Sequence, residues 1–402
     1  MTRPLGVGVI GAGVISHAYL GSICRSADLR LVAISSRGMA SAEAQARRYG
    51  GAAKPTEAIL ADPEVDIVVN LAPPAEHHPI GRAALLAGKH LYSEKPLATS
   101  LADARDVIAL ADSRGLTLGA APDTFLGPAH QAARRLLDEG VIGPVVGGAA
   151  VMASNGMEHW HPNPAFFYAP GGGPLLDIGP YMITQLVNLL GPVRAVTAFG
   201  TAPRRTRTVL SPERAGETFQ VNVPTTVNGA LLFENGANIA LTVSWDVVSH
   251  QRQAIELYGP AGTLSTVTPN NFDGEVRIGR GGGDWTIAHA GGGPAGPRDA
   301  REIVDALATL QKGLHPATGE PIGPDSPPLF GDLRGLGLVD LARAVREGRA
   351  PRAGAPLALH VLDVLLALEA GAEHGGAVQI TDGVARPDAL PAAPTQSGDP
   401  HD

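Results

Sequence analysis

The chain has 402 residues, more than one hydrophobic core usually organises, so its length predicts two domains. Its 44% hydrophobic and 17% charged residues are typical of a folded protein and argue against a disordered one. The net charge of −8, without a basic stripe, argues against a nucleic-acid partner. A single cysteine excludes an internal disulfide, and no apolar run approaches the roughly 18–20 residues that cross a bilayer. We therefore expect a cytoplasmic protein with neither nucleic-acid nor membrane partners.

The first third of the chain alternates strand and helix signals. Short apolar strands are predicted at 5–10, at 29–36 and in "VDIVVNLAPP", "HLYSEKP" and "LTLGAAP". Helical patterns separate them, and one of these, "SLADARDVIALADSRG", has Ser100 as its predicted N-cap. Strands separated by helices predict a parallel, doubly wound Rossmann sheet in an α/β domain spanning residues 1–123.

Strand-like runs dominate the chain after this domain. "FENGANIALTVSW" has an Asn-Gly pair between apolar runs, which predicts a hairpin. "LRGLGLVDLARAVREG" and "PLALHVLDVLLALEAGAEHG" are predicted helices, and "GRGGGDWTIAHAGGGPAGPR" is a predicted loop. We therefore predict a second α/β domain at 124–385 with a mostly antiparallel sheet, followed by a disordered tail at 386–402.

The stretch "VIGAGVIS" follows the first strand and opens a helix. Gly11 permits a tight turn, Gly13 lets the backbone approach a pyrophosphate, and the helix N-terminus would receive the phosphates. A tight turn without a ligand is the alternative. The second strand ends with Ser35, Ser36 and Arg37 instead of the carboxylate that binds the NAD ribose. These groups suit a 2′-phosphate, so NADP is favoured over NAD, with a solvated arginine as the alternative.

Several stretches together resemble the glucose–fructose oxidoreductase, inositol dehydrogenase and rhizopine catabolism (Gfo/Idh/MocA) family. They are "GVIGAGVIS", "NLAPPAEHHPIGRAALLAGKHLYSEKPLA", "LLDEGVIGPV" and "GGGPLLDIGPYMITQLVNLLG". The resemblance implies a Rossmann domain and a second domain whose large open sheet often supports oligomers. It also implies NAD(P)-linked oxidation or reduction of a sugar, polyol or glycoside. We therefore expect a homo-oligomer, a dimer or tetramer, formed through this sheet.

The same resemblance assigns residues to the cofactor. It places Lys95 near both nicotinamide and substrate, before a cis Lys95–Pro96 bond. A helix-capping role is the alternative for His77. The expected cofactor contacts are Gly11, Gly13, Val14, Ile15, Ser35, Ser36, Arg37, Leu71, Pro73, His77, Glu94 and Lys95.

The family pattern Asp-x-Gly-x-His is altered in this chain. Asp177 and Gly179 match it, but Tyr181 stands where the family has its general acid/base histidine. A phenol titrates at about pH 10, so a tyrosine can replace imidazole only if a nearby cation stabilises the phenolate. Lys95 is a candidate for that cation, which makes Lys95, Tyr181 and Asp177 the predicted catalytic set. In the alternative, Tyr181 only lines the pocket, or faces solvent on its helix, and Lys95 or another group moves the proton.

The predicted substrate contacts extend beyond this set. His159, Trp160 and His161 combine an aromatic ring with polar groups, as a pyranose requires. Asp123 is expected either to accept hydrogen bonds from sugar hydroxyls or to cap the next helix. His159, His161 and Asp177 lack the further spacing of a zinc site, so no metal is expected.

Three functions remain open. The first is an NAD(P)-dependent dehydrogenase acting on a sugar, polyol or glycoside. The second is a redox-neutral, NAD-dependent glycosidase that works through a transient 3-keto sugar, and the third is a non-catalytic sensor that retains nucleotide binding.

Overall fold

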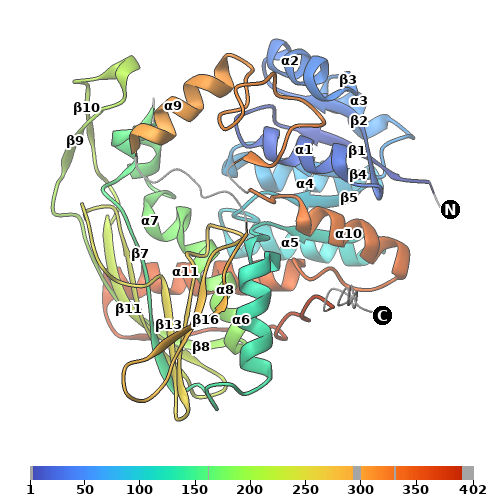
Figure 1. Ribbon diagram of the computed structural model, residues 1–402. Helices are drawn as coiled ribbons and strands as arrows, with labels where there is room; N and C mark the ends of the chain where they lie inside the picture. Colours follow the sequence, from blue (N-terminus) through green and yellow to red (C-terminus); the bar gives the residue numbers. More distant parts are fainter. Residues whose placement is uncertain (1–2, 162, 293–299, 330–331, 392–402) are drawn as a thin grey trace, which may run out of the picture.

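The first six strands form one parallel sheet (Figure 1). The computed structural model describes residues 3–161, 163–292, 300–329 and 332–391. The strand order β3-β2-β1-β4-β5-β6 is that of a doubly wound Rossmann fold, as predicted. These strands are β1 (Leu5–Ile10), β2 (Leu29–Ser35), β3 (Ala52–Ala53), β4 (Ile67–Asn70), β5 (His90–Ser93) and β6 (Leu118–Ala120).

Helices pack on both faces of this sheet because its strands are apolar on both sides. One buried cluster joins the sheet to α1, α2 and α10, and another joins it to α3, α4, α5 and α11. Ser100 caps α5 as predicted, since its Oγ accepts a hydrogen bond from the backbone N–H of Asp103. The helices are α1 (Ser16–Arg25), α2 (Met39–Tyr49), α3 (Thr56–Ala61), α4 (His77–Leu86), α5 (Leu101–Ser113), α10 (Leu336–Glu347) and α11 (Ala355–His374).

The second sheet has nine strands in the order β16-β15-β14-β13-β7-β12-β11-β8-β17. It is mostly antiparallel, as predicted, with one parallel pair between β7 and β12. The Asn-Gly hairpin joins β11 to β12, whereas the predicted glycine-rich loop contains β16. The strands are β7 (Gly147–Ala153), β8 (Val193–Thr201), β11 (Thr226–Phe233), β12 (Asn238–Ser244), β13 (Ile255–Gly259), β14 (Gly262–Thr266), β15 (Val276–Gly279), β16 (Trp285–His289) and β17 (Ala377–Gln379). A separate hairpin pairs β9 (Thr206–Thr208) with β10 (Thr218–Gln220).

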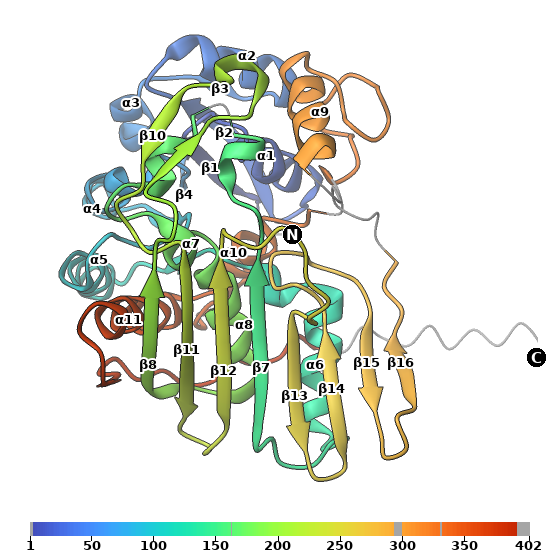
Figure 2. The same ribbon diagram turned by 90° about the vertical axis from the view of Figure 1, so that its left-hand side faces the viewer.

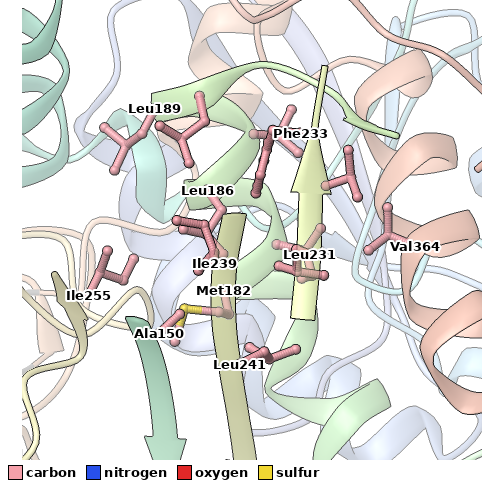
Figure 3. Packing of buried hydrophobic residues seen from close by; sticks show 14 of the residues in the cluster. Ala150, Met182, Leu186, Leu189, Leu231, Phe233, Ile239, Leu241, Ile255 and Val364 are labelled. Carbon is pink, nitrogen blue, oxygen red and sulfur yellow. The ribbon is translucent and has the colours of Figure 1, made fainter. Parts of the chain in front are cut away.

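In the described part of the chain, helices cover one face of this sheet and leave the other face open (Figure 2). The covering helices are α6 (Pro128–Asp138), α8 (Gly179–Leu190) and α11. Every residue of α8 is buried, and Met182, Leu186 and Leu189 pack with side chains of the sheet in the main core (Figure 3). The solvent-facing alternative for Tyr181 is therefore wrong, because α6, α11 and the sheet enclose this helix.

Helix α11 is long and apolar, although no run of membrane-spanning length was expected from the sequence. By length and composition its most apolar 18-residue window could cross a membrane. However, 61% of that window is buried inside the fold, where α11 packs against β8 and α8. Its apolar character is therefore that of a core helix shared by the two halves of the molecule.

The end of the chain differs from the predicted disordered tail. Arg386 forms an ion pair with Asp138 at 2.7 Å, and Arg134 donates to the Pro387 carbonyl at 2.7 Å. The described part of the tail, up to residue 391, is therefore anchored on α6, and 392–402 lies outside the described residues. Two further helices are α7 (Gly173–Asp177) and α9 (Ala300–Gln311), and the sequence reading missed α9.

Candidate active site

The turn between β1 and α1 has a shape that suits a diphosphate. Gly11 has φ +116°, and a Cβ there would lie 2.6 Å from the Leu71 backbone carbonyl, so only glycine fits. Gly13 is exposed and has no described atom within 4 Å of the place where its Cβ would be. Ser16 donates to the Gly13 carbonyl at 2.6 Å. Among the described residues no side chain caps α1, so its N-terminus can accept an anion.

Apolar side chains border this turn. Val14 and Pro73 are exposed, Ile15 is half-buried and Leu71 is buried. The Leu71 N–H donates to the Ile10 carbonyl at 2.7 Å, which holds the loop after β4 against the end of β1. Exposed apolar groups beside an open glycine turn are typical of a ligand site.

The end of β2 provides fewer free groups than the sequence predicted. Ser35 is buried, and its hydroxyl is 2.9 Å from the Thr56 hydroxyl, so it is already paired. Ser36 is half-buried and Arg37 is exposed. Within the described ranges, the Arg37 side chain forms no hydrogen bond or ion pair. Ser36 and Arg37 therefore remain available for a ligand, whereas Ser35 supports the loop.

His77 connects the loops around the site. It is 2% exposed, and its Nδ1 and Nε2 lie 2.6 Å from the Pro96 carbonyl and 2.8 Å from the Ala72 carbonyl. Both ring nitrogens are therefore occupied by backbone oxygens. His77 is also the first residue of α4, so its position is structural and neither nitrogen is free for a cofactor.

Two of the predicted catalytic residues, Lys95 and Asp177, form an ion pair at the carboxyl end of the parallel sheet, which the sequence did not predict. The Lys95 Nζ donates to the Asp177 Oδ1 at 2.9 Å and to the Asp177 backbone carbonyl at 2.7 Å. The Lys95–Pro96 peptide bond is cis, as expected. Burial would lower the pKa of Lys95, but Asp177, with Tyr181 and Glu94, raises it above the ordinary lysine value. Lys95 is therefore a permanent ammonium at neutral pH and can donate but not accept a proton.

Tyr181 lies against this ammonium. The Lys95 Nζ is 5.1 Å from the centroid of the Tyr181 ring, a cation–π distance. Behind Lys95, the Glu94 carboxylate accepts from the Lys95 backbone N–H at 2.8 Å and from the Tyr19 hydroxyl at 2.8 Å. Glu94 is 9% exposed, so it positions the Lys95 backbone from inside the fold.

A second cation, which sequence reasoning missed, reaches Tyr181. Arg334 precedes α10, and its Nη2 lies 3.3 Å from the Tyr181 Oη. The same nitrogen donates to the Asn270 Oδ1 at 2.9 Å, and the guanidinium pairs with Asp332. No sequence motif marks Arg334, which lies 153 residues from Tyr181 along the chain.

The comparisons with known proteins agree with this architecture. Residues 5–121 match the model described as "Oxidoreductase family, NAD-binding Rossmann fold", and residues 130–265 match the "GFO/IDH/MocA C-terminal domain". The chain is 31% identical over 261 residues to dTDP-3,4-didehydro-2,6-dideoxy-alpha-D-glucose 3-reductase of Streptomyces antibioticus, covering 64% of this chain and 74% of that protein. The chain belongs to the Gfo/Idh/MocA oxidoreductase family.

Other Gfo/Idh/MocA relatives include sugar dehydrogenases. D-glucoside 3-dehydrogenase of Escherichia coli (strain K12) is 29% identical over 252 residues, covering 61% of this chain and 71% of that one. The structure of levoglucosan dehydrogenase in complex with NADH and L-sorbose superposes with a TM-score of 0.74 at 20% identity. That match covers 95% of this chain and 100% of the other chain, and at this identity it shows a shared fold.

In this Gfo/Idh/MocA chain, the Asp123 carboxylate is hydrogen-bonded to the backbone at the start of α10. It is 1% exposed, and its Oδ2 accepts from the backbone N–H groups of Gly335 at 2.9 Å and Gly337 at 2.8 Å. Burial raises the pKa of Asp123 to about 6, although these two N–H groups oppose the shift. Asp123 therefore caps α10, not the next helix in sequence, and holds the chain immediately after Arg334.

His159, Trp160 and His161 occupy half-buried positions in the loop before α7, the helix that ends at Asp177. The His161 ring contacts the rings of Trp160, Phe166 and Phe167 edge-on at 5.0–5.4 Å between centroids. Their role as sugar contacts stays a prediction.

A buried ion-pair network anchors the start of this loop. Glu158 pairs with Arg207 at 2.7 Å, and Arg207 pairs with Asp246 at 2.6 Å. The Arg207 side chain is 1% exposed, so the β9–β10 hairpin is tied to the loop that carries His159. Among the described residues, no group of three His, Cys, Asp or Glu side chains is arranged to hold a metal.

Proposed function

We propose that the protein is an NAD(P)-dependent dehydrogenase that transfers a hydride between nicotinamide and a hydroxyl-bearing carbon of a sugar, polyol or glycoside. The observation that carries this proposal is the Lys95–Asp177 ion pair against Tyr181 at the end of the parallel sheet. Ligands bind at this edge in doubly wound folds. The sugar-modifying names of the family relatives support the same substrate class.

The side chains divide the work according to their charge. Lys95 remains protonated, so it donates a hydrogen bond to the reacting oxygen and does not remove its proton. Asp177 fixes the direction of the ammonium and offers its second carboxylate oxygen to substrate hydroxyls. Tyr181 is the remaining group beside Lys95, and we assign it the role of general acid/base. Its oxygen accepts the hydroxyl proton of the substrate during oxidation and returns a proton during reduction. Nicotinamide, when bound, accepts or supplies the hydride.

The open turn at Gly13 and the uncapped start of α1 fit the diphosphate of the cofactor. For the adenosine end, we propose NADP in preference to NAD, because Arg37 is exposed and unpaired within the described ranges. An Arg37→Asp variant should reverse this preference. The ratio of kcat/KM for NADP to that for NAD measures it, and an unchanged ratio would remove Arg37 from cofactor selection.

One experiment separates the three candidate functions. Purified protein is incubated with NADP⁺ or NAD⁺ and a panel of sugars, polyols and aryl glycosides, and reduced nicotinamide and released aglycone are followed together. Sugar-dependent reduction of the cofactor supports the dehydrogenase. Cofactor-dependent aglycone release without net reduction would instead show a redox-neutral glycosidase, and nucleotide binding alone would show a sensor.

The site assignment has its own test. Lys95→Met should lower kcat by about 10²–10³-fold, the usual cost of losing one positioned donor, while nucleotide binding remains. Lys89→Met is the matched control, because the Lys89 Nζ donates to the Asp62 carbonyl far from this pair. Equal activity of the two variants would contradict the role of Lys95.

We also propose that two copies associate through the open face of the nine-stranded sheet. Strand register places Phe199, Tyr258, Trp285 and Ile287 on that face, and they are 40–75% exposed. Light scattering should show an oligomer that Phe199→Glu dissociates, and a wild-type monomer would exclude the proposal.

A further inference from the structure

Arg334 is held in place by both halves of the molecule. Its backbone carbonyl accepts from Ser22 of α1 at 2.6 Å, and its guanidinium donates to Asn270 of the second domain at 2.9 Å. Asp332 pairs with the same guanidinium, and the side chain is 14% exposed. The next residue, Gly335, is fixed by Asp123. A long arginine side chain held by these contacts has lost most of its rotamer freedom, which suits a precise electrostatic role.

Lys95 and Arg334 approach Tyr181 in different ways. Lys95 faces the ring, and the two described hydrogen bonds of its Nζ both go to Asp177. The Arg334 Cζ is 5.7 Å from the ring centroid, while its Nη2 reaches the phenol oxygen itself. The sequence reading assigned Lys95 as the cation for the phenolate, but the hydrogen bond to the oxygen comes from Arg334.

The balance of charge around the phenol also favours this assignment. The charged groups that face it are Lys95 with Asp177 and Glu94 on one side, and Arg334 with Asp332 on the other. Guanidinium N–H groups can only donate, so the bond to Tyr181 strengthens when the oxygen becomes negative. Arg334 lies outside both segments that match the family models.

We infer that Arg334 is the positioning residue for proton transfer by Tyr181: it aims the phenol oxygen and stabilises the phenolate. This inference rests on the proposed dehydrogenase function. During oxidation, the O–H bond of the substrate breaks, its proton forms the O–H bond of Tyr181, and the hydride leaves the same carbon for the nicotinamide. During reduction, Tyr181 returns the proton and Arg334 stabilises the charge that remains on the phenol oxygen.

The test separates charge from hydrogen bonding. Arg334→Gln keeps a donor without the charge, and Arg334→Lys keeps the charge. In Arg334→Gln, the rising limb of the pH profile of kcat/KM for oxidation should move up by about one pH unit or more, as expected on loss of an opposite charge in contact. Arg334→Lys should move it less. The matched control is Arg343→Gln on α10, whose guanidinium pairs with Asp28 at 2.8 Å, and its profile should equal that of the wild type.

A second readout does not depend on turnover. The difference between the tyrosinate absorbance titrations of the wild type and Tyr181→Phe isolates the ionisation of this phenol. The corresponding difference between Arg334→Gln and the double variant with Tyr181→Phe should have its midpoint at a pH higher by about one unit or more. If no sugar is oxidised by the wild type, the dehydrogenase proposal fails, while this titration still decides whether Arg334 acts on Tyr181.

Any of three results would overturn the inference. One is an Arg334→Gln midpoint and pH profile identical to those of the wild type. Another is an equal shift in Arg343→Gln, which would indicate a general charge effect. A further loss of activity when Arg334→Gln is added to Tyr181→Phe would also contradict it, because residues acting through one oxygen are not additive.

Discussion

The Asp123→Asn variant should gain stability relative to the wild type as the pH rises from about 4 to 7, because the free energy of unfolding of the wild type falls over this range and that of the variant does not. The carboxylate is 1% exposed and serves as acceptor for the N–H groups of Gly335 and Gly337 at 2.9 and 2.8 Å. An asparagine carbonyl oxygen can accept the same two hydrogen bonds. The substitution therefore removes a buried charge while keeping the cap of α10.

The size of the effect follows from the pKa of Asp123. Burial raises this pKa to about 6 in the folded state, against about 3.9 in an unfolded chain. Between these values the folded state binds more protons, so the free energy of unfolding of the wild type falls as the pH rises. A difference of about 2 pKa units corresponds to about 3 kcal/mol, which is lost by pH 7. Asp123→Asn lacks this titration and should not lose that stability.

Urea unfolding at several pH values between 4 and 7 measures the difference between the two proteins. Asp123→Ala is the matched control, because it leaves the two N–H groups without an acceptor and should cost about 1–3 kcal/mol. A stability difference between Asp123→Asn and wild type that does not change with pH would refute the reasoning. A large rise in the KM for substrate, without that pH dependence, would show instead that Asp123 contacts the sugar.

Three further changes test other parts of the fold. Gly11→Ala should abolish nucleotide binding and lower the melting temperature, since its Cβ would lie 2.6 Å from a backbone carbonyl at a φ of +116°; normal binding, measured by calorimetry, would contradict this. His17→Gln should remove part of the loss of stability at acid pH. Burial, with the charge of Arg48, lowers the pKa of His17 to about 4, so in the wild type the full contribution of the neutral ring is present above about pH 6.5. About 3 kcal/mol of the free energy of unfolding is then lost as the pH falls to 4. Denaturation at pH 4.5 and 7.5 measures the difference in the free energy of unfolding between the wild type and His17→Gln, and a difference that is equal at both pH values would exclude this role of His17. Arg207→Met removes the buried cation that pairs with both Glu158 and Asp246 and should cost about 3–5 kcal/mol in a thermal or urea melt; a loss below 1 kcal/mol would show that the network is dispensable.

The sequence by itself determined those features that depend on local patterns. Alternating apolar strands and helices predicted the Rossmann sheet, and an Asn-Gly pair predicted the β11–β12 hairpin. The glycine turn was recognisable because Gly11 is required by its own backbone conformation. Lys95 and Asp177 were found because each stands in a short motif at the end of a strand or helix.

The tertiary structure alone decided which polar groups meet. It paired Ser35 with Thr56, placed Asp123 at the start of a helix 212 residues further along the chain, and brought Arg334 to the phenol of Tyr181. The described start of the predicted tail, residues 386–391, was misjudged for the same reason, because Arg386 and Pro387 have their partners on α6. Periodicity and turn chemistry act over a few residues, whereas these hydrogen bonds depend on which distant segments the core packs together. A polar residue in an irregular segment has no local signature of its partner, so the sequence pointed to Lys95 and Asp177 but not to Arg334, which the structure places beside Tyr181.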